Sequence, residues 1–373
     1  MKFAPLLFLI AALAANPARA QKDNLGPILV GQSAGLTGGQ ASYSADVRQG
    51  IEASFAAANR SGGINGREIK LVSLDDQGKK DNVVANTRKL VEQEKVAALI
   101  GYTSGAGVEA TLSYLDKGQV PMLSPVTGNM GIRSDFHRNL FHTRAGYDEE
   151  MRKLIGIMAL TNIKKFAIAY LDDVGPANPK AMHDALAASQ LKAVAAVPLN
   201  RNATDFGPQI DALVKANPEV VVFISNGPPI VKIIQGMRAK GFGGRFATSS
   251  FSGLKVIDDL KEGSLGLIMS QVLPPPTRTH VRVVSDFQRD LKDFAPTAKP
   301  NYTNLEAYIS GRVLVEAMRR TNGKLGGDRL VASLEEIRKL DLGGYEISFS
   351  AKNHDGSRFV DTGVVGGGGV LRF

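Results

Sequence analysis

The sequence predicts an α/β fold built as two lobes, and two observations support this. Strand-sized apolar runs alternate with segments whose apolar residues recur at helical spacing. The alternation stops near residues 144–148 and then starts again. Alternating strands and helices of this kind form parallel sheets with helices on both faces. A length of 373 residues agrees with two domains, at about 150 residues each.

The first block contains four strand candidates with helical segments between them. Val47, Ile51 and Phe55 recur every four residues, which is the spacing of one helix face. Asp81 is a suitable N-cap for the helix that follows the second strand. In chain order, the expected elements are a strand at 28–33, a helix around 47–55, a strand at 68–74, a helix at 81–94, a strand at 96–101, a helix ending at 117 and a strand at 120–123.

The second block repeats the same rhythm, and a different pattern follows it. Three consecutive prolines at 274–276 predict a stiff, extended connector after this block. The expected strands are 166–171, 194–199, 220–225 and 246–249, and the expected helices are 179–189, 206–216 and 230–240. Beyond the prolines we expect helices at 281–294 and 302–320, and short strands at 345–350, 358–362 and 369–373.

The N-terminus has the features of an export signal. Lys2 supplies a positive charge, residues 3–15 are apolar, and Pro17 precedes the small-residue pattern that ends at Ala20. The apolar run is short for a membrane span, which needs about 18 or more residues. We therefore expect a signal peptide at 1–20, cleavage after Ala20 and a secreted, periplasmic protein.

Charge and cysteine content exclude several classes of function. The formal net charge is +9, but basic and acidic residues are interleaved and no block of five or six like charges occurs. We expect an ordinary solvated surface and no nucleic-acid partner. The chain has no cysteine, so disulfides, thiolate metal sites, cysteine nucleophiles and a lipid-modified cysteine are all excluded.

The sequence contains no convincing catalytic motif, which predicts that the protein is not an enzyme. The five histidines show no HExxH or other ligand-spaced pair, and no phosphate-binding loop of the GxxxxGK[ST] type occurs. Residues 31–35 match GxSxG, but a hydrolase elbow needs the helix to start at the serine, and residues 36–39 intervene. Asp75 and Asp76 are either paired carboxylates or loop caps. We expect no cofactor and no metal.

Two turns after strands are candidates for ligand contacts. Residues 101–107 follow a strand and open a helix, where exposed backbone N–H groups attract carboxylates. A plain tight turn is the alternative, and the glycine spacing does not match a dinucleotide fingerprint. Residues 124–129 are rich in short hydrogen-bonding side chains and form either a helix-capping turn or a ligand loop.

Several stretches together resemble a known family. Residues 59–67 read Asn-Arg-Ser-Gly-Gly-Ile-Asn-Gly-Arg, and Ile69, Leu71 and the Asp75-Asp76 pair follow. This pattern resembles a hallmark of Leu/Ile/Val-type periplasmic binding proteins, the type I solute-binding proteins of ABC importers. Supporting stretches are 31–39, 98–101, 120–125 and 141–144.

The resemblance implies a fold, a mechanism and partners. The fold would be two doubly wound Rossmann-like lobes joined by three crossover segments, and the lobes would close on a small-molecule ligand by hinge motion. Lobe 1 would contain residues 21–145 plus about 275–348, and lobe 2 residues 146–274 plus about 349–373. An ABC permease in the cytoplasmic membrane would recognise the closed form. A monomer is the family's usual state.

The resemblance also implies site residues. In lobe 1 the turns that hold an amino acid's carboxylate and amine would contain Tyr102, Ser104 and Gly105, and Val126, Thr127 and Gly128. In lobe 2, Asn226 falls at a usual aromatic position, and Ser250, beside Phe251, falls where an acidic residue usually pairs with the amine. Tyr43 and Tyr147 are aromatic candidates for the cleft, or alternatively belong to surface or hinge packing.

The absence of an acidic residue at 250 bears on the ligand. A buried ammonium without a counter-charge costs several kcal/mol, which argues against a branched-chain amino acid unless Asp148 or Asp172 supplies the charge. An aromatic or short-chain carboxylic acid or an amide is an equal alternative. We therefore expect a substrate-binding component of an ABC importer. A ligand-sensing module that feeds a membrane receptor and a periplasmic α/β enzyme are the other candidates.

Overall fold

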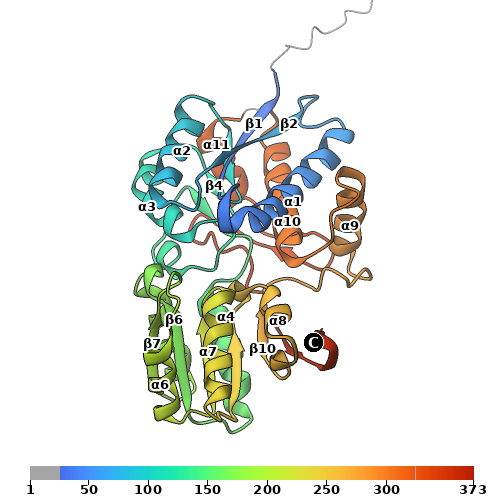
Figure 1. Cartoon of the computed structure of the whole chain (residues 1–373). Coiled ribbons are helices and arrows are strands. Elements are labelled where there is room, and N and C mark those ends of the chain that lie inside the picture. The colour runs from blue at the N-terminus through green and yellow to red at the C-terminus, as the bar shows by residue number, and fades with distance from the viewer. Residues whose placement is uncertain (1–25, 324) are drawn as a thin grey trace, which may run out of the picture.

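The computed structural model describes residues 26–323 and 325–373. The predicted signal peptide and its cleavage site lie outside these residues. Figure 1 shows two α/β lobes stacked one above the other, each with its own central sheet. The predicted fold class is confirmed. The predicted residue boundaries of the lobes stay a prediction. In the described ranges, no helix combines the length and hydropathy that crossing a bilayer requires.

The upper lobe contains a five-stranded parallel sheet in the order β2-β1-β3-β4-β5. Its strands are β1 (Ile28–Ala34), β2 (Ile69–Asp75), β3 (Ala98–Ile100), β4 (Met122–Leu123) and β5 (Leu140–Phe141). Its helices are α1 (Ala41–Arg60), α2 (Lys80–Glu92), α3 (Gly105–Lys117), α9 (Arg282–Phe294), α10 (Tyr302–Arg320) and α11 (Gly327–Glu335). Alternate residues of β1 serve the two faces of the sheet: Val30 joins the core under α1 and α10, and Leu29 packs against the core under α2 and α3.

The lower lobe contains a seven-stranded mixed sheet in the order β14-β13-β10-β9-β8-β6-β7. Five strands are parallel: β6 (Phe166–Leu171), β7 (Ala193–Leu199), β8 (Val220–Ile224), β9 (Arg245–Thr248) and β10 (Ile268–Gln271). The last two, β13 (Asp361–Val365) and β14 (Leu371–Arg372), run antiparallel to their neighbours. The helices are α4 (Tyr147–Leu160), α5 (Ala177–Ala188), α6 (Gly207–Ala216), α7 (Gly227–Ala239) and α8 (Lys255–Leu260).

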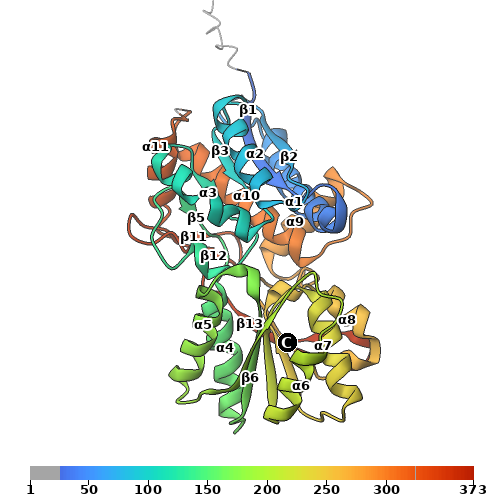
Figure 2. The same cartoon turned by 60° about the vertical axis from the view of Figure 1, so that its left-hand side comes forward.

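Three segments connect the lobes, and they contact one another. The first runs from β5 to α4, the second from β10 to α9, and the third leads from β12 (Glu346–Ile347), which pairs with β11 (Leu340–Asp341), to β13. The His142 amide donates to the His354 carbonyl at 2.9 Å, and the Gly356 amide donates to the His142 carbonyl at 2.8 Å. Figure 2 shows the result of the third crossing: the C-terminus lies in the lower lobe, although α9, α10 and α11 belong to the upper lobe.

The C-terminal strands differ most from the sequence prediction. The expected strand at 345–350 is reduced to two residues, because Ser350 and Asn353 pair across a turn and the chain then becomes the third crossover. The expected strand at 358–362 instead begins at Asp361 and continues to Val365. Crossover geometry leaves no signal in side-chain periodicity, so these bounds could not be predicted from alternation alone.

Candidate functional site

Loops that follow the strands of both sheets meet between the lobes. In parallel α/β sheets the carboxyl ends of the strands are the usual place for ligands. The Tyr147 hydroxyl, at the start of α4, lies 3.4 Å from the Thr127 hydroxyl, in the loop after β4. The Asn178 amide of α5 donates to Asn129 Oδ1 at 2.8 Å, and the Met130 amide donates to Asn178 Oδ1 at 2.9 Å. The predicted loop at 124–129 is therefore in direct contact with the lower lobe.

The two upper-lobe turns lie against each other. Ser104 caps α3, because its hydroxyl accepts a 3.0 Å hydrogen bond from the Gly107 amide. Thr127 Oγ1 accepts a hydrogen bond from the Asn129 amide, and a Cβ added at Gly105 would lie 3.1 Å from that same Oγ1. Glycine at 105 thus lets the two turns approach closely.

Gly128 has a similar role at the boundary between the lobes. A Cβ at this position would lie 2.5 Å from Cδ1 of the Tyr147 ring, and the Tyr147 amide donates to the Gly128 carbonyl at 2.9 Å. The ring of Tyr147 therefore packs directly on the glycine backbone. Tyr147 also stacks on Phe251, with ring centroids 5.8 Å apart.

The Tyr43 side chain reaches one of the predicted ligand loops, whereas the Tyr102 side chain points into the core. The Tyr43 hydroxyl donates to the Val126 carbonyl at 3.0 Å, so it reaches the loop after β4. Tyr102 is fully buried in the core under α2 and α3, where its hydroxyl lies 3.2 Å from that of Thr87. Only the backbone of Tyr102 borders the turn, and its carbonyl accepts from the Val126 amide at 2.9 Å.

In the lower lobe, Asn226 and Ser250 follow β8 and β9. Asn226 is the N-cap residue of α7, and its Oδ1 is buried without a hydrogen-bond donor in the described part of the chain. Ser250 begins a short 3-10 turn, and its hydroxyl accepts from Arg144 Nη2 at 2.6 Å and donates to Glu150 Oε1 at 2.9 Å. Ser250 is thus held by charged groups.

These charged groups form a buried cluster of Arg144, Glu150 and Glu306, which we call the charged cluster. Arg144 Nη2 donates to Glu150 Oε1 at 2.7 Å, and its Nη1 lies 3.4 Å from Glu306 Oε2. The side chains are 5%, 0% and 7% exposed, in that order. The cluster links the first crossover to α4 and α10, and therefore both lobes.

The electrostatics of the cluster follow from this burial. Burial alone would lower the pKa of Arg144, but the Glu306 and Glu150 carboxylates hold that pKa above its ordinary value. Burial raises the pKa of Glu306, and Arg144 only partly opposes this. Burial also raises the pKa of Tyr147 to about 12, so this phenol stays neutral. The region between the lobes is therefore poorly solvated, and charges in it need partners.

Sequence reasoning missed the charged cluster. The sequence indicates Arg144 only as part of a crossover pattern, and Glu306 is 162 positions away from it in the chain, so no local spacing links the two residues. The two acidic candidates that the sequence offered lie elsewhere: Asp148 pairs with Arg152 at 3.5 Å, and Asp172 is exposed in a 3-10 turn.

The other sequence motifs have structural roles. Asp75 accepts hydrogen bonds from the Leu36 and Gln77 amides at 2.9 and 2.8 Å, and Asp76 accepts from the Ser33 hydroxyl at 3.0 Å. The acidic pair therefore caps loops, and the serine of the GxSxG string lies buried at the end of β1. Within residues 26–323 and 325–373, no group of three or more His, Asp or Glu side chains is placed to hold a metal ion.

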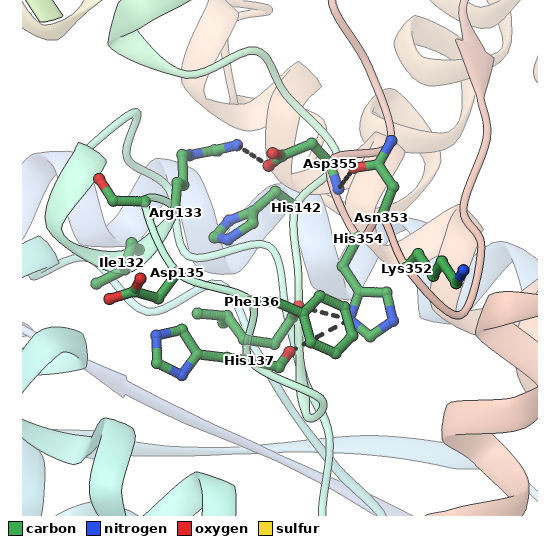
Figure 3. Close-up of a pocket in the computed structure, with 12 residues that line it drawn as sticks. Ile132, Arg133, Asp135, Phe136, His137, His142, Lys352, Asn353, His354 and Asp355 are labelled. Carbon is green, nitrogen blue, oxygen red and sulfur yellow. Dashed lines mark hydrogen bonds and ion pairs between the residues drawn. The ribbon is translucent and has the colours of Figure 1, made fainter.

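A separate cavity lies beside the first and third crossovers (Figure 3). Its volume is about 220 Å³. Arg133 Nη1 donates to Asp355 Oδ1 at 2.6 Å across it, and His354 Nδ1 lies 3.1 Å from the Leu140 carbonyl. The His354 ring stacks on Phe141 with centroids 3.7 Å apart. Burial, and next the Arg133 charge, hold the pKa of His142 well below its ordinary value.

Comparisons with known proteins agree with this architecture. Residues 27–368 match the profile of a family described as periplasmic binding protein. An amino acid binding protein of Pseudomonas aeruginosa is 26% identical over 225 residues, which cover 60% of each chain. The Leu/Ile/Val-binding protein homolog 2 of Brucella abortus is 33% identical over 150 residues, 40% of each chain. The matches thus span 60% and 40% of the length of these relatives.

A crystal structure shows the similarity over the whole fold. An extracellular ligand-binding receptor from Verminephrobacter eiseniae superposes with a TM-score of 0.83 at 27% sequence identity. The match covers 93% of this chain and 100% of the other.

Proposed function

This chain belongs to the periplasmic binding protein family, and we propose that it is the substrate-binding component of an ABC importer. It is a binding protein and not an enzyme. The observation that supports the proposal best is the 2.8 Å hydrogen bond from the Asn178 side-chain amide to Asn129 Oδ1, since it joins α5 of the lower lobe to the loop after β4 of the upper lobe. This contact requires the two lobes to be close together.

The proposed mechanism is capture by hinge closure. A ligand stabilises the closed form only to the extent that it binds that form more tightly than the open one. Residues from both lobes must therefore contact it. We propose that the ligand is a small polar solute, an amino acid or a related carboxylate or amide. Its proposed contacts are Tyr43, the backbone at Tyr102, Ser104, Gly105, Val126, Thr127, Gly128, Tyr147, Asn226, Ser250 and Phe251.

The cellular setting is also proposed. The lobes would divide near residues 145, 274 and 348, a signal peptide would be removed after Ala20, and the mature protein would act in the periplasm as a monomer. Its partner would be an ABC permease of the cytoplasmic membrane. The two relatives named amino acid binding protein and Leu/Ile/Val-binding protein homolog support the general ligand class.

Thermal unfolding with a ligand panel tests this proposal. The mature protein, residues 21–373, should be unfolded and refolded first to remove any ligand carried from the host. The panel should hold branched-chain amino acids, their deaminated acids, aromatic acids, dicarboxylates and short amides. A ligand present at about 100 times its Kd should add roughly 2.7 kcal/mol to the free energy of unfolding. If no member of the panel stabilises the protein, the proposed ligand class is wrong.

A further inference from the structure

One carboxylate oxygen of the charged cluster is buried and accepts no hydrogen bond. The Glu306 side chain is 7% exposed, and its Oε2 lies 3.4 Å from Arg144 Nη1. Its Oε1 has no donor in the described part of the chain. A buried acceptor without a donor carries a desolvation penalty. We propose that Glu306 Oε1 receives the protonated amino group of the ligand, so that the solute is an amino acid or another cationic amine.

The position of Glu306 fits this role. Arg144, its ion-pair partner, lies with its guanidinium carbon 5.9 Å from the centre of the Tyr147 ring and donates to Ser250. Tyr147 in turn contacts Thr127 of the upper-lobe loop. Glu306 therefore belongs to the same enclosed region as the proposed ligand contacts from both lobes, and the inference rests on the proposed function.

The count of buried charges favours a cationic group. The cluster contains two carboxylates, Glu150 and Glu306, and one guanidinium, Arg144. The neighbouring Arg133 is already paired with Asp355 at 2.6 Å. When both carboxylates are ionised, the cluster has a net charge of −1. A ligand ammonium balances that charge, whereas a plain carboxylate would add a second uncompensated negative charge in a buried site.

The other acidic group of the cluster is fully occupied. The Glu150 oxygens accept from Arg144 Nη2 at 2.7 Å, from the Ser250 amide at 2.7 Å, and from the hydroxyls of Ser250 and Ser270 at 2.9 and 2.6 Å. Glu306 Oε1 is thus the open carboxylate oxygen of the cluster. A serine at 250 therefore does not argue against an amine, because the counter-charge comes from α10 of the upper lobe.

Calorimetric titration with matched ligand pairs tests the proposal. Each pair differs by one amino group: L-leucine and 4-methylpentanoate, L-phenylalanine and 3-phenylpropanoate, L-glutamate and glutarate, 4-aminobutanoate and butanoate. On the wild-type protein, the amine-bearing member of the binding pair should be tighter by on the order of 100-fold. Equal or tighter binding of a deaminated acid overturns the inference while leaving the proposed function intact. If neither member of any pair binds, the inference is overturned, and the wider thermal-unfolding panel decides separately whether the proposed ligand class is also wrong.

Two variants on α10 then assign the effect to Glu306. Glu306→Gln keeps the shape but removes the charge, and it should weaken the amine-bearing ligand by on the order of 100-fold while leaving its deaminated partner within a few-fold. Glu316→Gln is the matched control, because Glu316 pairs with Arg320 at the surface, and it should leave both affinities unchanged. An unchanged amine affinity in Glu306→Gln contradicts the inference. If Glu306→Gln does not fold, the comparison of matched ligands on the wild-type protein still tests the inference.

Discussion

The Tyr345 hydroxyl oxygen lies 2.8 Å from the carbonyl oxygen of Thr143. The same hydroxyl is 3.2 Å from the carbonyl oxygen of Val272. Thr143 belongs to the first crossover, Val272 to the second, and Tyr345 lies just before the third. A single buried side chain therefore ties together the segments about which the lobes would move.

Replacing Tyr345 by phenylalanine should destabilise the protein. The variant keeps the ring but leaves two buried carbonyl groups without this donor, which costs about 1–3 kcal/mol. Urea unfolding of both proteins measures the difference. Tyr170→Phe is the control, because no hydrogen bond joins the Tyr170 hydroxyl to the described residues, and it should change stability by less than about 0.5 kcal/mol. Equal stabilities of Tyr345→Phe and wild type would show that the Tyr345 hydroxyl does not stabilise the crossover segments.

Arg144→Met should be severely destabilising. Glu150, whose side chain is 0% exposed, loses its cation in this variant, and breaking a buried pair on one side costs about 3–5 kcal/mol. The comparison is Arg152→Met on the surface of α4, where the Glu149 pair is partly solvated and its loss should cost under about 1 kcal/mol. Chemical denaturation resolves the two cases. A cost below about 1 kcal/mol for Arg144→Met would mean that the cluster relaxes or takes up protons readily.

His142 should make the protein less stable in mild acid. Burial, followed by the Arg133 charge, holds its folded-state pKa well below the ordinary value of 6.5. The unfolded chain therefore binds a proton below pH 6.5 that the folded chain does not bind, so the free energy of unfolding falls as pH decreases from 6.5 towards the folded-state pKa. The slope from this one group approaches about 1.4 kcal/mol per pH unit.

A variant separates the effect of His142 on stability in mild acid from the effect of protonating carboxyl groups. His142→Asn should show a shallower loss of stability than wild type between about pH 7 and pH 5, whatever its stability at neutral pH. His183→Asn, which changes an exposed histidine of α5, is the matched control. Denaturant midpoints measured across this pH range compare the pH dependence of stability in the wild type and the variants. Parallel curves for His142→Asn and wild type would exclude His142 as the source.

Gly50→Ala should disturb the packing of α1 on α10. A Cβ at Gly50 would lie 2.1 Å from the Asn304 carbonyl oxygen, so the helices must separate, at a typical overpacking cost of about 1–3 kcal/mol. Gly156→Ala in α4 is a matched change, since a Cβ there meets nothing within 4 Å. It should stabilise by about 0.5–1 kcal/mol because alanine favours the helix. Melting temperatures that move in the same direction would refute this contrast.

The fold was more predictable from sequence than the site. All five residues of β8 (Val220–Ile224) are buried, as the β-branched run predicted, and residues 59–67 form the expected turn, with Ile64 and Arg67 paired across it. Both features are determined by residues that are close together in the sequence, so local patterns predict them. The charged cluster depends instead on how α10 returns to the first crossover, and Tyr102 showed that a residue in the right turn can direct its side chain into the core.

The late position of β13 and β14 in the chain affects the order in which the two lobes can fold during synthesis. β13 and β14 pair beside β10 and come from residues 361–372. During synthesis, domains generally fold in order from the N-terminus. Here one edge of β10 would stay unpaired until residues 361–365 have been synthesised, and α9 to α11 of the upper lobe also emerge after most of the lower lobe. Each lobe is therefore completed only by segments that are synthesised after most of the other lobe, so the two lobes cannot fold strictly one after the other.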